Sequence, residues 1–327
     1  MNLDLSDEAL EYGRVARRAI EKAGGDLLVQ EAERDPVSRQ SLVAPLLGEL
    51  GAAELDVRDS SDQLEAAAAL CRSFGYWGVA YPVAEVLCRP RDLDVDGLVV
   101  VSDEGAPAAR PKAAVAGLPL RWAAVTPDGL RSIARPRPLA VAPRKSGFVT
   151  ELDLDQVDSK GSLDAALGLV LPCWTLLGML DRAMELTCSY VQQRQQFGQP
   201  LAAFQGVQFQ LTDAEVERAG LEELAKYTLW SIEAAREDAL HDALALRLAA
   251  IEAADTVFRI THQLHGAIGF CDETTLSWLS RYSIPLRRLP LGLSATRYEL
   301  SRRIGPRGLS GLFGPRPPGD RSIGANS

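Results

Sequence analysis

The fold of this 327-residue chain is decided by one stretch, Arg194-Gln-Gln-Phe197-Gly198-Gln-Pro200-Leu-Ala-Ala-Phe204-Gln205. It lies between two long apolar helical patterns and breaks the chain at Phe197-Gly198. An arginine at such a helix end offers a planar fork of donors to a phosphate. Gln205 lies near the start of the next helix, whose free N–H groups favour anions. An ordinary helix–turn–helix corner with an exposed arginine explains the same residues, so both interpretations stay open.

A second stretch follows some sixty residues later: His262-Gln263-Leu-His265-Gly266-Ala-Ile-Gly269-Phe270. Its two glycines would let a ligand approach the backbone closely, because glycine has no side chain to obstruct it. Gln263 and His265 would add directional polar contacts. A helix end capped by a glycine in the left-handed conformation fits this stretch as well.

Taken together, the two stretches resemble the acyl-CoA dehydrogenase family. The shared pattern is Arg-x-x-Phe-Gly-x-Pro-Leu-x-x-Phe-Gln, followed by Gln-x-His-Gly-x-x-Gly-Phe. Tyr190 before the first stretch and Arg281 after the second fit the same pattern. The resemblance is strong over residues 163–304, moderate over the N-terminal helices and poor in the middle of the chain.

The resemblance implies that FAD binds across a subunit interface. The residues that it assigns to FAD are Arg194, Phe197, Gln205, Gln263 and Gly266. Arg194 is expected at the FAD diphosphate, Phe197 against the dinucleotide and Gln205 at the adenosine half. Gln263 and the Gly266 backbone are expected at the diphosphate and ribityl region.

No carboxylate occupies the positions at which this family places its catalytic base. Most members have a glutamate where this chain has Pro290 or Leu291, and a minority have it where this chain has Gly168. Removing a proton next to a thioester carbonyl requires such a base. The resemblance therefore implies that this chain contains no catalytic residue. Asp164, one helical turn before Gly168, is a weak candidate for a displaced base, and Glu252 is a second one.

The order of sequence patterns predicts a mainly α protein with a small middle β domain, ending in a four-helix-type bundle. We expect an N-terminal helical domain over residues 1–85 and a reduced β domain over 86–160. The C-terminal bundle should cover 161–304, and the Gly/Pro/Arg/Ser-rich tail 305–327 should be disordered. Long helices are expected at about 163–193, 204–235 and 237–265, followed by a helix-rich segment over 275–304.

Finer details of the first 160 residues are also predicted. A short helix is expected to start near Pro45 and to stop at Gly51. Short β-type runs in the middle region are Leu98–Val101, Trp122–Val125, Leu139–Ala142 and Gly147–Thr150. This region lacks the family's flavin-holding stretches, since Ser102-Asp103-Glu104 resembles one of them only weakly.

The composition of the chain limits the partners, the cellular location and the metal sites that we expect. With 46% hydrophobic and 24% charged residues the chain is globular, and its net charge of -9 argues against nucleic-acid or anionic-membrane partners. The apolar run 165–180 contains Pro172 and is expected to be a buried helix. The N-terminus shows no signal-peptide pattern, and five scattered cysteines predict reduced thiols in the cytoplasm. The three histidines and five cysteines show no zinc-ligand spacing, so no metal site is expected.

The resemblance implies a function as the small, non-catalytic subunit of a heteromeric α2β2 acyl-CoA dehydrogenase. A larger catalytic subunit would supply the glutamate and most of the acyl-CoA contacts, while this chain would complete the FAD site. Actinobacterial complexes of this kind act on bulky, steroid-derived CoA thioesters, which places the chain in lipid metabolism and steroid degradation. Two alternatives stay open: a structural paralogue that binds no flavin, and a self-sufficient homomeric enzyme with an atypical base.

Overall fold

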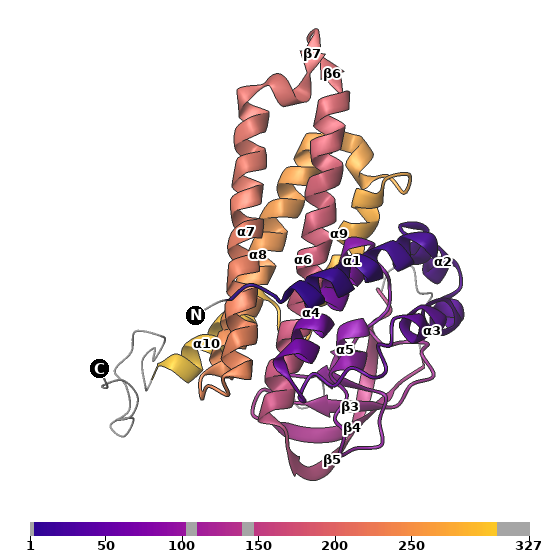
Figure 1. Cartoon of the computed structure of the whole chain (residues 1–327), viewed down its shortest axis with the longest axis vertical. Helices are drawn as coiled ribbons and strands as arrows, with labels where there is room; N and C mark the ends of the chain where they lie inside the picture. The colour runs from indigo at the N-terminus through magenta and orange to yellow at the C-terminus, as the bar shows by residue number, and fades with distance from the viewer. Residues whose placement is uncertain (1–2, 103–109, 139–146, 306–327) are drawn as a thin grey trace.

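The computed structural model describes residues 3–102, 110–138 and 147–305 of the chain. Figure 1 shows a group of N-terminal helices beside a small sheet, and a long helical arm that projects from both. The chain is mainly helical with a small β sheet, as the sequence predicts.

The N-terminal helices pack against the centre of the arm. They are α1 (Asp7–Lys22), α2 (Leu27–Arg34), η1 (Pro36–Ser38), α3 (Arg39–Glu49), α4 (Ser61–Tyr76) and α5 (Val83–Leu87). The side chain of Ser60 accepts a hydrogen bond from the Gln63 N–H and so caps the start of α4. Further along α4, a Cβ on Gly75 would lie 1.8 Å from the backbone oxygen of Thr175 in the arm. Glycine is therefore required where the two helix backbones meet.

Pro45 does not start a helix. It lies inside α3, which begins at Arg39, so the predicted start was wrong. The 3-10 turn Pro36–Ser38 leads directly into α3, so the helix begins before Pro45 and not at it. The predicted stop is confirmed, because Gly51 follows the helix end with a φ of 64°.

The sheet has five strands in the order β1-β3-β4-β5-β2. They are β1 (Gly97–Val100), β2 (Lys112–Ala113), β3 (Trp122–Val125), β4 (Leu130–Pro136) and β5 (Thr150–Lys160). β1 pairs with β3 in parallel, and the other pairs are antiparallel. β1 and β3 match predicted runs and are fully buried, whereas β4 and most of β5 were missed. Both missed strands are only partly buried and carry charged residues, so neither shows the continuous apolar run that marks β1 and β3.

The run Gly147–Thr150 forms a turn and the start of a strand. Gly147 and Phe148 have positive φ values of 53° and 61°, so only Thr150 enters β5. Three other predictions, the strand at Leu139–Ala142, the motif echo at Asp103-Glu104 and the disordered tail after Gly305, lie outside the described residues.

The arm consists of long helices around a central one. Its elements are α6 (Ser162–Gln193), β6 (Gln195–Gln196), β7 (Gln199–Pro200), η3 (Leu201–Ala203), α7 (Gln205–Glu233), α8 (Ala239–His265), η4 (Gly266–Phe270), α9 (Thr275–Arg288) and α10 (Leu293–Ile304). α6 is long and apolar enough to cross a membrane by length and composition alone. In the structure 89% of its most apolar window is covered by other parts of the fold, which confirms the prediction of a buried helix.

Candidate functional site

The two sequence motifs lie at one end of the arm, where α6, α7 and α8 begin or end (Figure 1). α6 ends at Gln193, and Arg194 is its C-terminal cap. The Arg194 N–H donates to the Tyr190 carbonyl, and the Arg194 carbonyl accepts from the Leu201 N–H, both at 2.8 Å. These two bonds fix the Arg194 backbone. Its exposed guanidinium forms no hydrogen bond or ion pair with any described residue.

Beyond Arg194 the chain forms a tight two-stranded hairpin, β6–β7, at the tip of the arm. Phe197 and Gly198 make its turn with φ values of 50° and 82°. Phe197 is 90% exposed, and its ring meets the ring of Phe204 edge-on at 6.3 Å. A phenylalanine that is held in the left-handed region and is almost fully exposed gains little from intrachain packing. Its exposure is what a ligand or partner contact would require.

Gln205 is the first residue of α7 and is exposed. No side chain caps this helix, and the N–H groups of Gln205 and Gly206 donate to no described residue. The start of α7 therefore presents free donors and the positive end of a helix dipole next to the Arg194 segment.

The second motif ends α8 and forms the short helix η4. Gly266 has a φ of 65°, and a Cβ there would meet nothing within 4 Å, so its Cα faces open space. The Gly266 N–H already donates to the carbonyls of His262 and Gln263. Two groups of this motif are predicted to contact FAD. The Gln263 side chain is exposed and free to do so, whereas the Gly266 N–H is already hydrogen-bonded within the chain.

Aromatic stacking joins the two motifs. The ring of Tyr190 stacks on His265 with a centroid distance of 4.5 Å, and His262 stacks on Phe270 at 4.3 Å. The Nδ1 atom of His265 lies 2.9 Å from the Thr261 carbonyl. Burial lowers the pKa of both histidines below the usual value. Both rings are therefore neutral around neutral pH and act as flat aromatic surfaces.

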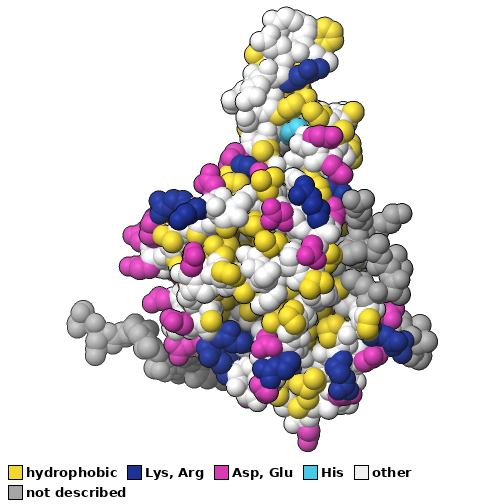
Figure 2. Space-filling view, turned by 90° about the vertical axis from the view of Figure 1, so that its right-hand side faces the viewer, with side chains coloured by type: hydrophobic (Ala, Val, Ile, Leu, Met, Phe, Trp, Pro, Cys, Tyr) yellow, Lys and Arg dark blue, Asp and Glu magenta, His cyan; other side chains and the backbone are white. Residues whose placement is uncertain are grey.

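Large apolar side chains surround this end of the arm and are exposed. The set comprises Phe197, Phe209, Ile268 and Phe270, and the least exposed of them, Ile268, is 45% exposed. Figure 2 shows hydrophobic side chains gathered near the top of the arm beside a basic residue and a histidine. The first motif drew attention to Phe197 but not to Phe209 or Ile268. Apolar residues on the outer face of a predicted helix are the signal that could have found them.

Neither base position holds a carboxylate in this chain. A Cβ on Gly168 would lie 2.6 Å from a methyl group of Val100, so a side chain there would require Val100 in strand β1 to shift. Pro290 and the buried Leu291 lie in the segment between α9 and α10. The buried Arg247 fixes this segment by donating to the carbonyls of Leu286, Leu289 and Leu291.

The two candidate displaced bases are both occupied by ion pairs. Asp164 is 1% exposed; its Oδ1 accepts from Arg58 Nη2 at 2.6 Å and its Oδ2 from Arg131 Nε at 2.7 Å. Guanidinium donors occupy both carboxylate oxygens, so neither oxygen is free to take up a proton from substrate. Glu252 pairs with Arg297 on the surface at 2.7 Å. The geometry favours structural roles for both residues.

Comparison with known proteins places the motifs in a family. Residues 170–290 match the model of the acyl-CoA dehydrogenase C-terminal domain. The chain is 33% identical over 107 residues to a 3-sulfinopropanoyl-CoA desulfinase of Paraburkholderia xenovorans, a match that covers 32% of this chain and 26% of that protein. It is 35% identical over 92 residues to the acyl-CoA dehydrogenase FadE28 of Mycobacterium tuberculosis, covering 28% and 27%. The chain thus matches about a quarter of the length of these relatives.

Solved structures share the fold over nearly the whole chain. The ChsE4–ChsE5 complex from Mycobacterium tuberculosis matches with a TM-score of 0.71 at 16% identity, covering 94% of this chain and 100% of that one. A Tcur3481–Tcur3483 steroid ACAD variant matches with a TM-score of 0.74 at 20% identity, covering 91% and 98%. At these identities the likeness concerns the fold alone. The match of residues 170–290 to the acyl-CoA dehydrogenase C-terminal domain agrees with the resemblance that the two motifs indicated.

Proposed function

Residues 170–290 form an acyl-CoA dehydrogenase C-terminal domain, and on this premise we propose that the chain is the non-catalytic subunit of a heteromeric, FAD-dependent acyl-CoA dehydrogenase. A larger partner chain supplies the catalytic glutamate and most contacts to the acyl-CoA, and the two assemble as α2β2 in the cytoplasm. The substrate is a bulky, steroid-derived thioester. The observation that carries the proposal is that both motifs meet at one end of the arm, while neither base position holds a carboxylate.

The residues at the tip of the arm fit FAD. A diphosphate needs cationic and N–H donors, and the free guanidinium of Arg194 and the uncapped start of α7 offer both. The planar ring of Phe197 and the amide of Gln205 suit the adenosine half. Gln263 and the open Cα face of Gly266 suit the diphosphate and ribityl region.

The bound flavin supplies a hydride acceptor for the oxidation of a carbon–carbon bond. This chain's own residues bind and orient the cofactor. Arg194 neutralises phosphate charge, and the Tyr190–His265 stack holds the two motifs at a fixed separation. With no carboxylate at position 168, 290 or 291, this chain contributes no proton acceptor at the positions where the family places one.

The exposed apolar residues at the tip support a partner in this region. Isolated apolar side chains are common on protein surfaces, but four large ones on neighbouring elements are typical of an interface. The ChsE4–ChsE5 complex and the Tcur3481–Tcur3483 steroid ACAD share this fold, which supports an unlike partner. A purely structural paralogue would gain nothing from a free arginine and an uncapped helix start at the same place.

Co-expression with the product of a neighbouring acyl-CoA dehydrogenase gene tests the proposal. We expect the two chains to co-purify as one complex with bound flavin, and either chain alone to bind less. Light scattering after size-exclusion chromatography gives the stoichiometry, and absorbance gives the flavin count. A monomer that remains colourless with every candidate partner would exclude this function.

A further inference from the structure

The tip of the arm carries almost no charge. The 22 residues from Tyr190 to Leu211 include eight glutamines and a single charged side chain, that of Arg194. The whole chain is 24% charged, so a stretch of this length would on average hold about five charged residues. We call residues 190–211 the tip segment; they comprise the end of α6, the β6–β7 hairpin, η3 and the start of α7 (Figure 1).

The tip segment is exposed, and most of its amide groups have no partner within the chain. Five exposed glutamines form no side-chain hydrogen bond with any described residue: Gln192, Gln195, Gln196, Gln199 and Gln205. Phe197 and Phe209 lie among them and are 90% and 60% exposed. A solvated surface usually carries charges of both signs, whereas the core of a protein interface is depleted of charge and enriched in aromatic residues. The tip segment therefore has the composition of an interface core.

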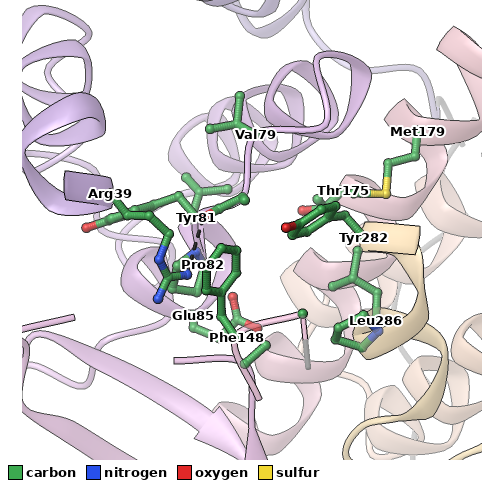
Figure 3. Close-up of a pocket in the computed structure, with 15 residues that line it drawn as sticks. Arg39, Val79, Tyr81, Pro82, Glu85, Phe148, Thr175, Met179, Tyr282 and Leu286 are labelled. Atoms are coloured by element: carbon green, nitrogen blue, oxygen red, sulfur yellow. Dashed lines mark hydrogen bonds between the residues drawn. The ribbon is translucent and has the colours of Figure 1, made fainter. Parts of the chain in front are cut away.

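Other parts of the described chain differ from the tip segment. The outer strand β5 carries exposed charges in ion pairs, such as Asp153 with Arg110, as a solvated surface does. A cavity at the centre of the molecule lies between α5, α6 and α9, and Figure 3 shows Arg39 on one side of it, Tyr282 on the other and Glu85 between them. Its volume of about 60 Å³ holds no segment of a partner chain. Neither place offers a partner an exposed and uncharged surface.

The scarcity of charge in the tip segment defines the surface that it fits. A charged group of a partner would lose its water there without gaining a counter-charge, because Arg194 is the one formal charge and binds the cofactor diphosphate in the proposed function. On the basis of that function, we propose that the tip segment docks on an uncharged surface of the larger partner subunit. This surface offers amide, hydroxyl or backbone groups to the glutamines and apolar side chains to Phe197 and Phe209.

A second copy of this chain fits the tip segment less well than an unlike partner. Two copies that met tip to tip about a two-fold axis would place the same residues opposite each other. The two Arg194 guanidinium groups would then approach each other without a counter-charge, which is unfavourable when water is excluded. The geometry therefore favours the unlike chain as the occupant.

Charges of both signs, introduced at the hairpin, test the chemistry of the partner surface. Gln196 and Gln199 pair in β6–β7 and are both exposed, so each is changed to Glu and to Lys. Each variant is co-expressed with the product of the neighbouring acyl-CoA dehydrogenase gene, and analytical ultracentrifugation at saturating FAD gives the dissociation constant of the two chains. All four variants should associate about tenfold to a hundredfold more weakly, whatever the sign, because either charge would be buried unpaired. Gln156→Glu and Gln156→Lys, at an exposed glutamine of β5, are matched controls that should leave association unchanged.

The sign of the effect decides between an uncharged and a charged partner surface. If either sign leaves association unchanged or strengthens it, the proposal is overturned, and strengthening that fades with added salt identifies a charged partner surface. Flavin absorbance of each recovered complex should equal that of the wild type, and weaker association that occurs only with flavin loss also overturns the proposal. A flavin-loaded wild-type complex with sign-dependent variants retains the proposed function and removes this inference alone. A wild-type chain that forms no complex removes both.

Discussion

The phenol ring of Tyr190 lies flat against the imidazole of His265, with a centroid distance of 4.5 Å and an angle of 17° between the planes. Tyr190 precedes the first motif on α6, and His265 belongs to the second motif at the end of α8. Through this stack the two motifs, which are separated by some sixty residues of sequence, contact each other and form one surface. Burial also lowers the pKa of His265, because a charged ring would lose hydration there, and the ring therefore stays neutral around neutral pH.

The stack should therefore contribute measurably to stability. In a double-mutant cycle with Tyr190→Leu and His265→Ala, we expect a coupling free energy of about 0.5–1.5 kcal/mol, the usual range for aromatic pairs. Urea unfolding of the four proteins measures it. Additive effects of the two substitutions would mean that the rings touch without stabilising the arm.

Arg194→Ala should weaken FAD binding in the assembled complex by about tenfold to a hundredfold, because a charge-assisted contact to phosphate contributes about 1.5–3 kcal/mol. Arg194→Lys should restore only part of the affinity, since an ammonium group cannot form the paired contact. The measurement is flavin absorbance after dialysis. Arg288→Ala is the control, because Arg288 is exposed, has no ion pair among the described residues and ends α9 far from the tip. Full flavin retention in a folded Arg194→Ala complex would favour a structural paralogue.

The isolated chain should show no dehydrogenase activity. Loss of a positioned base typically costs about two to four orders of magnitude in rate, and this chain has none at position 168, 290 or 291. A panel of acyl-CoA thioesters with an artificial electron acceptor tests this expectation. Robust turnover that disappears in Asp164→Asn or Glu252→Gln would identify an atypical base and reject the non-catalytic role.

Asp164→Asn should instead unfold the protein more easily. The substitution leaves Arg58 and Arg131, both largely buried, without their shared carboxylate. Breaking a buried ion pair from one side costs about 3–5 kcal/mol. Asp153→Asn removes an exposed pair with Arg110 and should cost at most about 1 kcal/mol. Thermal and urea unfolding of both variants distinguish the two cases, and equal effects would contradict the structural role of Asp164.

Glu85 should make stability depend on pH in a defined direction. Its pKa is raised from 4.5 to about 7, so the folded state retains a proton that the unfolded state has lost between these values. Stability from this group is present below about pH 4.5 and is lost as the pH rises through about 7, a change of about 3 kcal/mol. The buried thiols of Cys71 and Cys88, which interact with it, have raised pKa values and stay neutral in this range.

Glu85→Gln should remove this dependence. Relative to the wild type, the variant should gain about 3 kcal/mol of stability between about pH 5 and pH 8, because no carboxylate then has to be charged inside the cavity. Urea unfolding at a series of pH values measures the difference, in which all other titrating groups cancel. If the free energies of unfolding of the wild type and the variant change with pH in parallel, the Glu85 carboxyl is solvated in the folded protein.

The sequence by itself determined the helical elements and the family. Helix ends at Gly51 and Gly266 follow from glycine in the left-handed conformation, and the long apolar patterns gave α6, α7 and α8 close to their observed bounds. These features depend on spacing within a few helical turns, which a sequence displays directly. The family also follows from sequence, because its two motifs are short and contiguous, and their positions along the chain identify Arg194, Phe197, Gln205, Gln263 and Gly266 as candidates.

Only the tertiary structure decided what those residues and their neighbours touch. Arg58 reaches Asp164 across 106 residues of sequence, and this pairing changes a candidate base into a structural anion. The cavity around Glu85 is assembled from α5, α6, α9 and the residues before β5, so no local pattern marks it. The one local signal is an acidic residue inside the apolar run around Val83–Leu87. Burial, ion pairing and the close approach of Gly75 to Thr175 are set by how distant segments pack, and packing depends on all contacts at once.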